Sequence, residues 1–157
     1  MVIDIKKINW RSPGMILVAI MALALALRLW VIWLLPCYSF DEMVSTSVAV
    51  KPLGQIWSYV RWEMHPPLHF YYLHAWFVVF GAGEWSARFS SLLLSLISIL
   101  VIYILAKEIF KSRPAGLFAA FLYSISAIFA FYGIWARMYE MLFLFSALSY
   151  LFFWRQK

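Results

Sequence analysis

The stretch Pro67–Phe80, with the sequence PLHFYYLHAWFVVF, decides the fold, because the topology of the chain depends on whether it crosses a membrane. It holds 14 residues, whereas a helix that spans the hydrocarbon core needs about 20 apolar residues. It also carries His69 and His74, and ionisable side chains are costly inside a bilayer. Length and polarity therefore favour a helix that lies along the membrane surface.

The composition around this stretch is that of an integral membrane protein. Hydrophobic residues make up 66% of the chain and charged residues 13%, whereas about 25% of the residues in a soluble domain are charged. The nine Trp and nine Tyr suit the two membrane–water interfaces. The net charge of +6 gathers in short segments beside apolar runs, which is typical of a topology signal. We therefore predict no nucleic-acid partner.

Four other apolar runs are candidates for membrane spans. The first begins at Pro13, a residue suited to the first turn of a helix. The last is marginal in length and ends in Arg155-Gln156-Lys157, a plausible interfacial stop. The four predicted spans are about 13–35, 85–106, 115–136 and 138–154.

The basic residues decide between four spans and five. If Pro67–Phe80 stays outside and the N-terminus is cytoplasmic, eight of the 13 basic residues lie inside and five outside. If the stretch spans, five basic residues lie inside and eight outside. That distribution opposes the preference for positive charge on the cytoplasmic side. The eight are Lys6, Lys7, Arg11, Lys107, Lys111, Arg113, Arg155 and Lys157. We therefore predict a single all-α membrane domain over 1–157. It is multi-pass in the cell membrane, with both termini cytoplasmic and an external loop over 36–84.

Two interfacial helices are predicted in this loop, at about 40–50 and 67–80. Ser39 and Glu42 fit a capping box at the start of the first helix, where carboxylates also meet the positive helix end. The breaker cluster at 51–54 ends that helix. The aromatic stretch 55–64 is compatible with either a further short helix or a turn.

The adjacent carboxylates of Asp41 and Glu42, just outside the first span, are the main candidates for chemistry. The alternative is that they only cap a helix. Arg28 lies within the first span, where an arginine costs about 2.5–3.5 kcal/mol on insertion scales. We expect its side chain either to extend to the interface, or to pair with these acids or bind a lipid phosphate.

Several short motifs give the chain a resemblance to a known superfamily. They are Asp41-Glu42, His65-Pro66-Pro67-Leu68, Phe80-Gly81, and Glu84 leading to Arg88. In this order and spacing they resemble the GT-C membrane glycosyltransferases, in the branch of protein O-mannosyltransferases, aminoarabinose transferases and RgtA-like enzymes. The resemblance runs from about Arg28 to Trp154 and corresponds to the N-terminal part of a longer catalytic module.

This resemblance implies a glycosyltransferase that uses a polyprenyl- or dolichyl-phosphate sugar on the external face. The acceptor would be a protein, a lipid or a glycan. In such enzymes an acidic residue of the first external loop is the catalytic base, which points to Asp41, with Glu42 beside it. Because the departing phosphate is a good leaving group, one carboxylate suffices, unlike in a glycosidase. Attack opposite the phosphate would invert the anomeric centre.

Substrate-binding candidates come from the same resemblance and from residue chemistry. Arg137, Tyr139 and Glu140 lie in the second external loop, which in the family faces the same cavity. Arg137 offers a bidentate fork to phosphate oxygens, although it could equally be an interfacial anchor. His65 is expected at the cavity edge. His69 and His74 are expected at the interface.

A metal site is not predicted. His65 and His69 stand four apart, but the two prolines between them break helical geometry, and no third ligand follows. We therefore name no cofactor and leave a need for a divalent metal open. Glu84 and Arg88, also four apart, are expected to pair at a helix start.

Two alternatives remain at this point. The chain could be a non-catalytic membrane subunit or remnant of the same fold, needing a second membrane chain for further helices. A small transporter fits less well, because transporters place polar groups along several spans and the cores of the second and third predicted spans carry no charge.

Overall fold

The computed structural model describes residues 13–35, 37–62 and 65–156, and over these residues the fold contains helices and no strand. The basic N-terminal residues Lys6, Lys7 and Arg11, and the terminal Lys157, lie outside the described residues. The helices are α1 (Pro13–Leu34), α2 (Phe40–Ala49), α3 (Leu53–Val60), α4 (Pro67–Phe80), α5 (Glu84–Ile109), α6 (Arg113–Ile125), α7 (Ala127–Tyr132) and α8 (Tyr139–Arg155). The predicted all-α class is confirmed.

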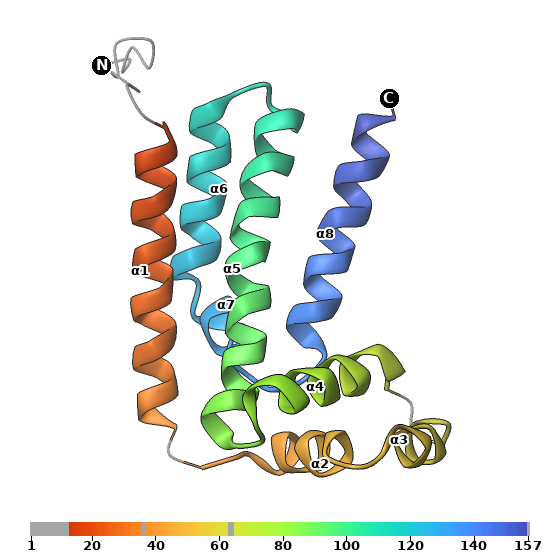
Figure 1. The fold of residues 1–157 in the computed structure, drawn as a ribbon. Coiled ribbons are helices and arrows are strands. Elements are labelled where there is room, and N and C mark those ends of the chain that lie inside the picture. The colour runs from red at the N-terminus through yellow and green to blue at the C-terminus, as the bar shows by residue number, and fades with distance from the viewer. Residues whose placement is uncertain (1–12, 36, 63–64, 157) are drawn as a thin grey trace, which may run out of the picture.

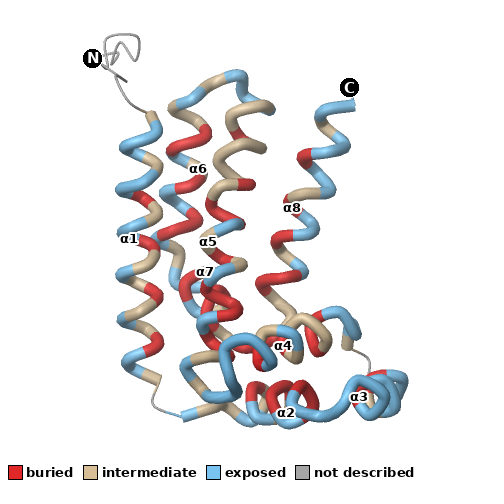
Figure 2. The backbone as a smooth tube through the Cα atoms, viewed as in Figure 1, coloured by how far each residue is buried: buried red, intermediate tan, exposed pale blue. Residues whose placement is uncertain are grey.

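Helices α1, α5, α6 and α8 stand side by side as a bundle, and α2, α3 and α4 lie across one end of it (Figure 1). The start of α1 and the end of α8 lie at the opposite end. Buried positions face the interior of this arrangement, and exposed positions face outward along every upright helix (Figure 2). The stretch Pro67–Phe80 thus forms a helix in the layer that crosses the end of the bundle.

By length and composition, α1 and α5 are the two described helices that could cross a membrane. Helix α8 has 17 residues, somewhat fewer than the roughly 20 of a typical span. The predicted span 115–136 differs more, because its helix breaks at Ser126 and ends at Tyr132. Four spanning segments are compatible with this fold and stay a prediction.

The break at Ser126 faces Arg28, which is fully buried. Its guanidinium donates hydrogen bonds to the carbonyls of Ser124 and Phe129, on either side of the break, and to Ser95 of α5. The sequence had suggested that Arg28 extends to the interface or pairs with the acidic dipeptide. In the structure it does neither, because its guanidinium is buried and bonded within the bundle. A buried cation finds its partners in hydroxyl and carbonyl groups.

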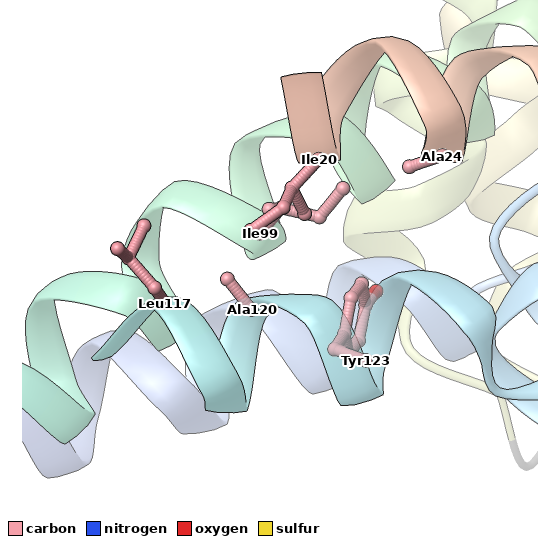
Figure 3. Close-up of a cluster of buried hydrophobic side chains, with 6 residues drawn as sticks. All are labelled: Ile20, Ala24, Ile99, Leu117, Ala120 and Tyr123. Carbon is pink, nitrogen blue, oxygen red and sulfur yellow. The ribbon is translucent and has the colours of Figure 1, made fainter. Parts of the chain in front are cut away.

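Small residues bring the upright helices together. The core between α1, α5 and α6 contains Ala24 and Ala120 beside larger aliphatic side chains (Figure 3). Gly116 of α6 approaches α5 so closely that a Cβ there would lie 2.6 Å from the Tyr103 carbonyl. Close backbone approach at small residues is typical of helix packing in membranes.

The crossing layer follows its local sequence signals. The capping box at the start of α2 is present: the Ser39 hydroxyl accepts from the Glu42 amide at 3.3 Å, and the Glu42 carboxylate accepts from the Ser39 amide at 3.0 Å. Helix α3 covers 55–60 of the stretch 55–64 that the sequence left open, and residues 63 and 64 lie outside the described residues. Helix α4 ends at Phe80, and the next residue, Gly81, has a φ of 81°, which favours glycine.

Candidate active site

The Glu42 carboxylate joins three segments of the chain: the start of α2, α5 and the turn before α8. It is 2% exposed and accepts two N–H bonds from the Arg88 guanidinium, at 3.1 and 3.0 Å. It also accepts the backbone amides of Ser39, at 3.0 Å, and of Ala136, at 3.2 Å. The expected pair of Arg88 with Glu84 is wrong, because Arg88 turns to Glu42 instead. Glu84 accepts a bond from the Tyr38 amide.

Arg88 also connects the end of α1 to the Glu42 carboxylate. Its two terminal nitrogens donate to the carbonyls of Leu35 and Cys37, which follow α1 directly. Burial alone would raise the pKa of Glu42, but the bonds from Arg88 and from the two backbone amides outweigh it and hold the pKa below its usual value. Glu42 is therefore an ionised carboxylate whose oxygens are occupied by these donors.

A second set of bonds fixes the turn between α7 and α8. The Trp135 indole donates to the Ser39 hydroxyl at 2.7 Å, and Ser91 of α5 donates to the Trp135 carbonyl at 2.8 Å. The Trp135 ring packs against Tyr132 and Tyr139, with centroids 5.5 Å away in both pairs. The candidate Tyr139 thus belongs to an aromatic cluster beside the turn.

Arg137 comes out of this turn onto one face of α2. Arg137 is 6% exposed, and its guanidinium donates to the Ser45 hydroxyl at 3.1 Å and to the Asp41 carbonyl at 3.5 Å. The other terminal nitrogen lies 3.2 Å from Nε2 of His65. The structure therefore brings together three of the predicted residues: Asp41, His65 and Arg137.

Asp41 differs from its neighbour Glu42 in burial and in hydrogen bonding. Its side chain is half-buried, and no donor among the described residues makes a hydrogen bond to its carboxylate. A general base needs a free carboxylate in reach of the acceptor proton. Of the two adjacent acids, the geometry favours Asp41 for that task.

Arg28 and Glu140 do not join this group. Glu140 is buried inside the bundle and accepts from the hydroxyls of Ser98, at 2.6 Å, and Tyr123, at 2.7 Å. The Tyr123 hydroxyl is also 3.4 Å from the Ser95 hydroxyl, which accepts the Arg28 bond. A chain of hydroxyl groups thus connects the two charges, and neither faces Asp41.

His69 was missed by the sequence analysis, which expected it at the interface. It is 2% exposed, and neither ring nitrogen makes a well-formed hydrogen bond. Burial lowers the pKa of His69 to about 4; the nearby Ala136 carbonyl opposes this shift, and Arg137 adds to it. The missed signal was spacing, because His69 shares a helical stripe with the buried Leu73 and Phe77.

Two cavities flank the group. One of about 220 Å³ lies on the Glu42 side, and its lining is Leu35, Cys37, Tyr38, Ser39, Glu42, Arg88, Phe131, Ile134 and Trp135. The other, about 80 Å³, lies between α4 and α8, and its lining is Pro66, Leu68, His69, Met138, Met141, Leu142 and Phe145. Among the described residues, no three His, Cys, Asp or Glu side chains gather closely enough to hold a metal ion.

Comparison with known proteins agrees with the resemblance. The family model described as dolichyl-phosphate-mannose-protein mannosyltransferase matches residues 64–156, which run from before α4 to the end of α8 and contain Arg88 and Arg137. No curated protein and no solved structure matches the chain. Asp41 and Glu42 precede the matched residues, and the Glu42–Arg88 ion pair connects the start of α2 to the matched region. The chain belongs to the dolichyl-phosphate-mannose-protein mannosyltransferase family and is a glycosyltransferase-type membrane module.

Proposed function

We propose that this chain carries the sugar-transfer site of a membrane glycosyltransferase. The donor is a sugar linked to a polyprenyl or dolichyl phosphate, the acceptor is a hydroxyl on the external face, and Asp41 is the general base. One observation carries the proposal: the Arg137 guanidinium lies along α2 against the Asp41 carbonyl and Ser45, on the helix that bears a free carboxylate. The cation proposed for phosphate thus contacts the backbone of the residue that carries the proposed base.

The reaction follows from these two groups. The Asp41 carboxylate takes the proton of the acceptor hydroxyl while the acceptor oxygen attacks the anomeric carbon opposite the phosphate. The bond between that carbon and the phosphate oxygen breaks, and its electron pair leaves with the phosphate. Arg137 stabilises the departing anion through charge-assisted hydrogen bonds. Attack from the opposite face inverts the anomeric configuration.

Glu42 and Arg88 act as positioning residues in this scheme. Glu42 accepts the amide of Ala136, the residue directly before Arg137, and caps the helix that carries Asp41. A carboxylate that already accepts four N–H bonds has little capacity left to take a proton from a substrate. Its contribution is to hold the Arg137 turn and the start of α2 in register.

The test is sugar transfer by the Asp41→Asn variant in native membranes supplied with a polyprenyl-phosphate sugar. We expect transfer to fall by about 10²–10⁴-fold, the usual contribution of a general base, with membrane insertion unchanged. Glu108→Gln is the matched control, because Glu108 pairs with Arg155 at the far end of the bundle. Undiminished transfer by Asp41→Asn would remove Asp41 from the mechanism. A wild-type chain that transfers no sugar would favour a non-catalytic subunit.

A further inference from the structure

One buried carboxylate inside the bundle has no task in the reaction as written so far. Glu140, in the first turn of α8, is 1% exposed. Its Oε1 accepts the Ser98 hydroxyl of α5 at 2.6 Å and the Tyr123 hydroxyl of α6 at 2.7 Å. Oε2 has no partner among the described residues. Burying a carboxylate costs free energy that hydrogen bonds offset, and here one oxygen anchors the start of α8 to two neighbouring helices.

The bonds on this oxygen belong to a chain whose direction is fixed. Arginine can only donate, so Nε of Arg28 donates to the Ser95 hydroxyl at 2.8 Å. The Tyr123 hydroxyl has a single proton, which it donates to Glu140. Toward the Ser95 hydroxyl, 3.4 Å away, Tyr123 is therefore the acceptor. The chain runs from a cation on α1 through hydroxyls of α5 and α6 to an acid on α8.

The start of α8 is also the end of the turn that carries Arg137. Arg137 lies three positions before Glu140 in the sequence. On its other side, the Ala136 amide donates to the Glu42 carboxylate at 3.2 Å. Glu42 therefore holds the residue before Arg137, and Glu140 holds the helical turn after it. Without the second anchor, the backbone of this cation would keep its support on one side and lose it on the other.

We propose that Glu140 is a positioning residue for sugar transfer, which holds Arg137 where the departing phosphate forms. It acts through the bonds that Ser98 and Tyr123 donate to it. This inference rests on the proposed function and deepens it, because it gives the cation of the site a second support, independent of Glu42. A misplacement of about 1 Å can slow an enzyme about a hundredfold, so an anchor three residues away is close enough to control the rate.

The experiment compares Glu140→Leu with Glu140→Gln in the same transfer assay as Asp41→Asn. Leucine has no acceptor, so both hydroxyl bonds are lost, whereas glutamine keeps an acceptor oxygen for them and places its amide group at the unpartnered Oε2 position. Glu140→Leu should lower kcat about tenfold to a hundredfold and leave the acceptor KM unchanged. Glu140→Gln should retain transfer within about threefold, because both bonds remain.

Leu144→Ala is the matched control, because Leu144 is buried on the same helix beyond its first turn. The cavity that it leaves weakens the packing of α8 but keeps the bonds of Glu140. Transfer per folded molecule should therefore equal that of the wild type. A loss as large as that of Glu140→Leu would show that general packing of α8, and not this anchor, controls the rate.

A second measurement does not depend on transfer. Hydrogen–deuterium exchange over 133–138, in the purified chain in lipid nanodiscs, should be at least about tenfold faster in Glu140→Leu and close to the wild type in Glu140→Gln. If Glu140→Leu fails to fold, Tyr123→Phe keeps the ring, removes one of the two bonds and should speed this exchange about tenfold.

Three results would each overturn the inference: unchanged exchange in these variants, equal losses of transfer in Glu140→Leu and Glu140→Gln, or faster exchange with undiminished transfer. The proposed function fails separately. A wild-type chain that transfers no sugar would count against that function, and the exchange measurement would still decide whether Glu140 anchors the turn that carries Arg137.

Discussion

At the scale of single residues, Glu42 and Asp41 show how adjacent acids acquire different tasks. On α2 they are neighbours in sequence, yet one is enclosed by Arg88 and two backbone amides and the other is half-buried without a donor. The difference comes from the helix, which turns consecutive side chains about 100° apart. One carboxylate thus has its acceptor positions filled, while the other has no donor among the described residues, which is the difference that the proposed roles use.

The first prediction at this scale concerns the Glu42–Arg88 ion pair. Glu42→Gln should lower the free energy of unfolding by about 3–5 kcal/mol, because it leaves a buried guanidinium without its counter-charge. Thermal unfolding of the purified protein in detergent measures this. Glu108→Gln, which breaks the exposed pair with Arg155, should leave the unfolding temperature nearly unchanged. Equal unfolding temperatures for the two variants would contradict the structural role of Glu42.

The second prediction concerns acid sensitivity and His69. Burial lowers the pKa of His69 in the folded state from 6.5 to about 4. Between pH 4 and pH 6.5, His69 is therefore protonated in the unfolded chain and neutral in the folded chain. Stability should therefore be complete above about pH 6.5 and fall as the pH drops toward 4, by at most about 1.4 kcal/mol per pH unit. Chemical unfolding curves across this window check it. His69→Phe should have the flatter profile, and parallel profiles would show that His69 is not buried neutral.

At the scale of elements, the turn from Gly133 to Met138 determines where Arg137 lies. Gly133 has no room for a side chain: a Cβ would lie 2.5 Å from the Ser95 hydroxyl of α5 and 2.6 Å from the Phe129 carbonyl of α7. The second contact is with backbone, which cannot rotate away. The turn can therefore lie this close to α5 and α7 only with glycine at position 133.

A prediction for this element follows from that packing. Gly133→Ala should displace the turn, lower stability by about 1–3 kcal/mol as overpacking does, and reduce sugar transfer through the displaced Arg137. Unfolding and transfer assays on the same preparation measure both effects. Gly54→Ala on α3 is the control, because nothing lies within 4 Å of its added Cβ. If Gly133→Ala matches that control, the turn is not sterically locked.

At the scale of the whole molecule, the features that depend on local sequence patterns could be predicted. The layer across the bundle end was predictable from the length of Pro67–Phe80, and the start of α2 from Ser39 and Glu42. The choice of Arg88 as the partner of Glu42 was not predictable, because the two are 46 positions apart and no periodicity links them. The nearer Glu84 was the natural expectation.

The hydroxyl chain from Arg28 to Glu140 escaped prediction for the same reason. It needs single side chains from α1, α5, α6 and α8, which meet only after the bundle has formed. Serine and tyrosine are unremarkable within apolar segments, and their role depends on which helix lies opposite. The same holds for the break at Ser126, since the apolar pattern runs through it without interruption.

That break bears on how the protein is made. Peptide carbonyls on either side of Ser126 receive hydrogen bonds from Arg28, and hydrocarbon offers such groups no substitute. If the predicted span over 115–136 enters the membrane during synthesis, α1 has to lie next to α6 and α7 at that stage. Without α1 beside them, the carbonyls of Ser124 and Phe129 and the Arg28 guanidinium would all lack their partners in hydrocarbon. We therefore expect correct insertion of this predicted span to require that α1 is already in place.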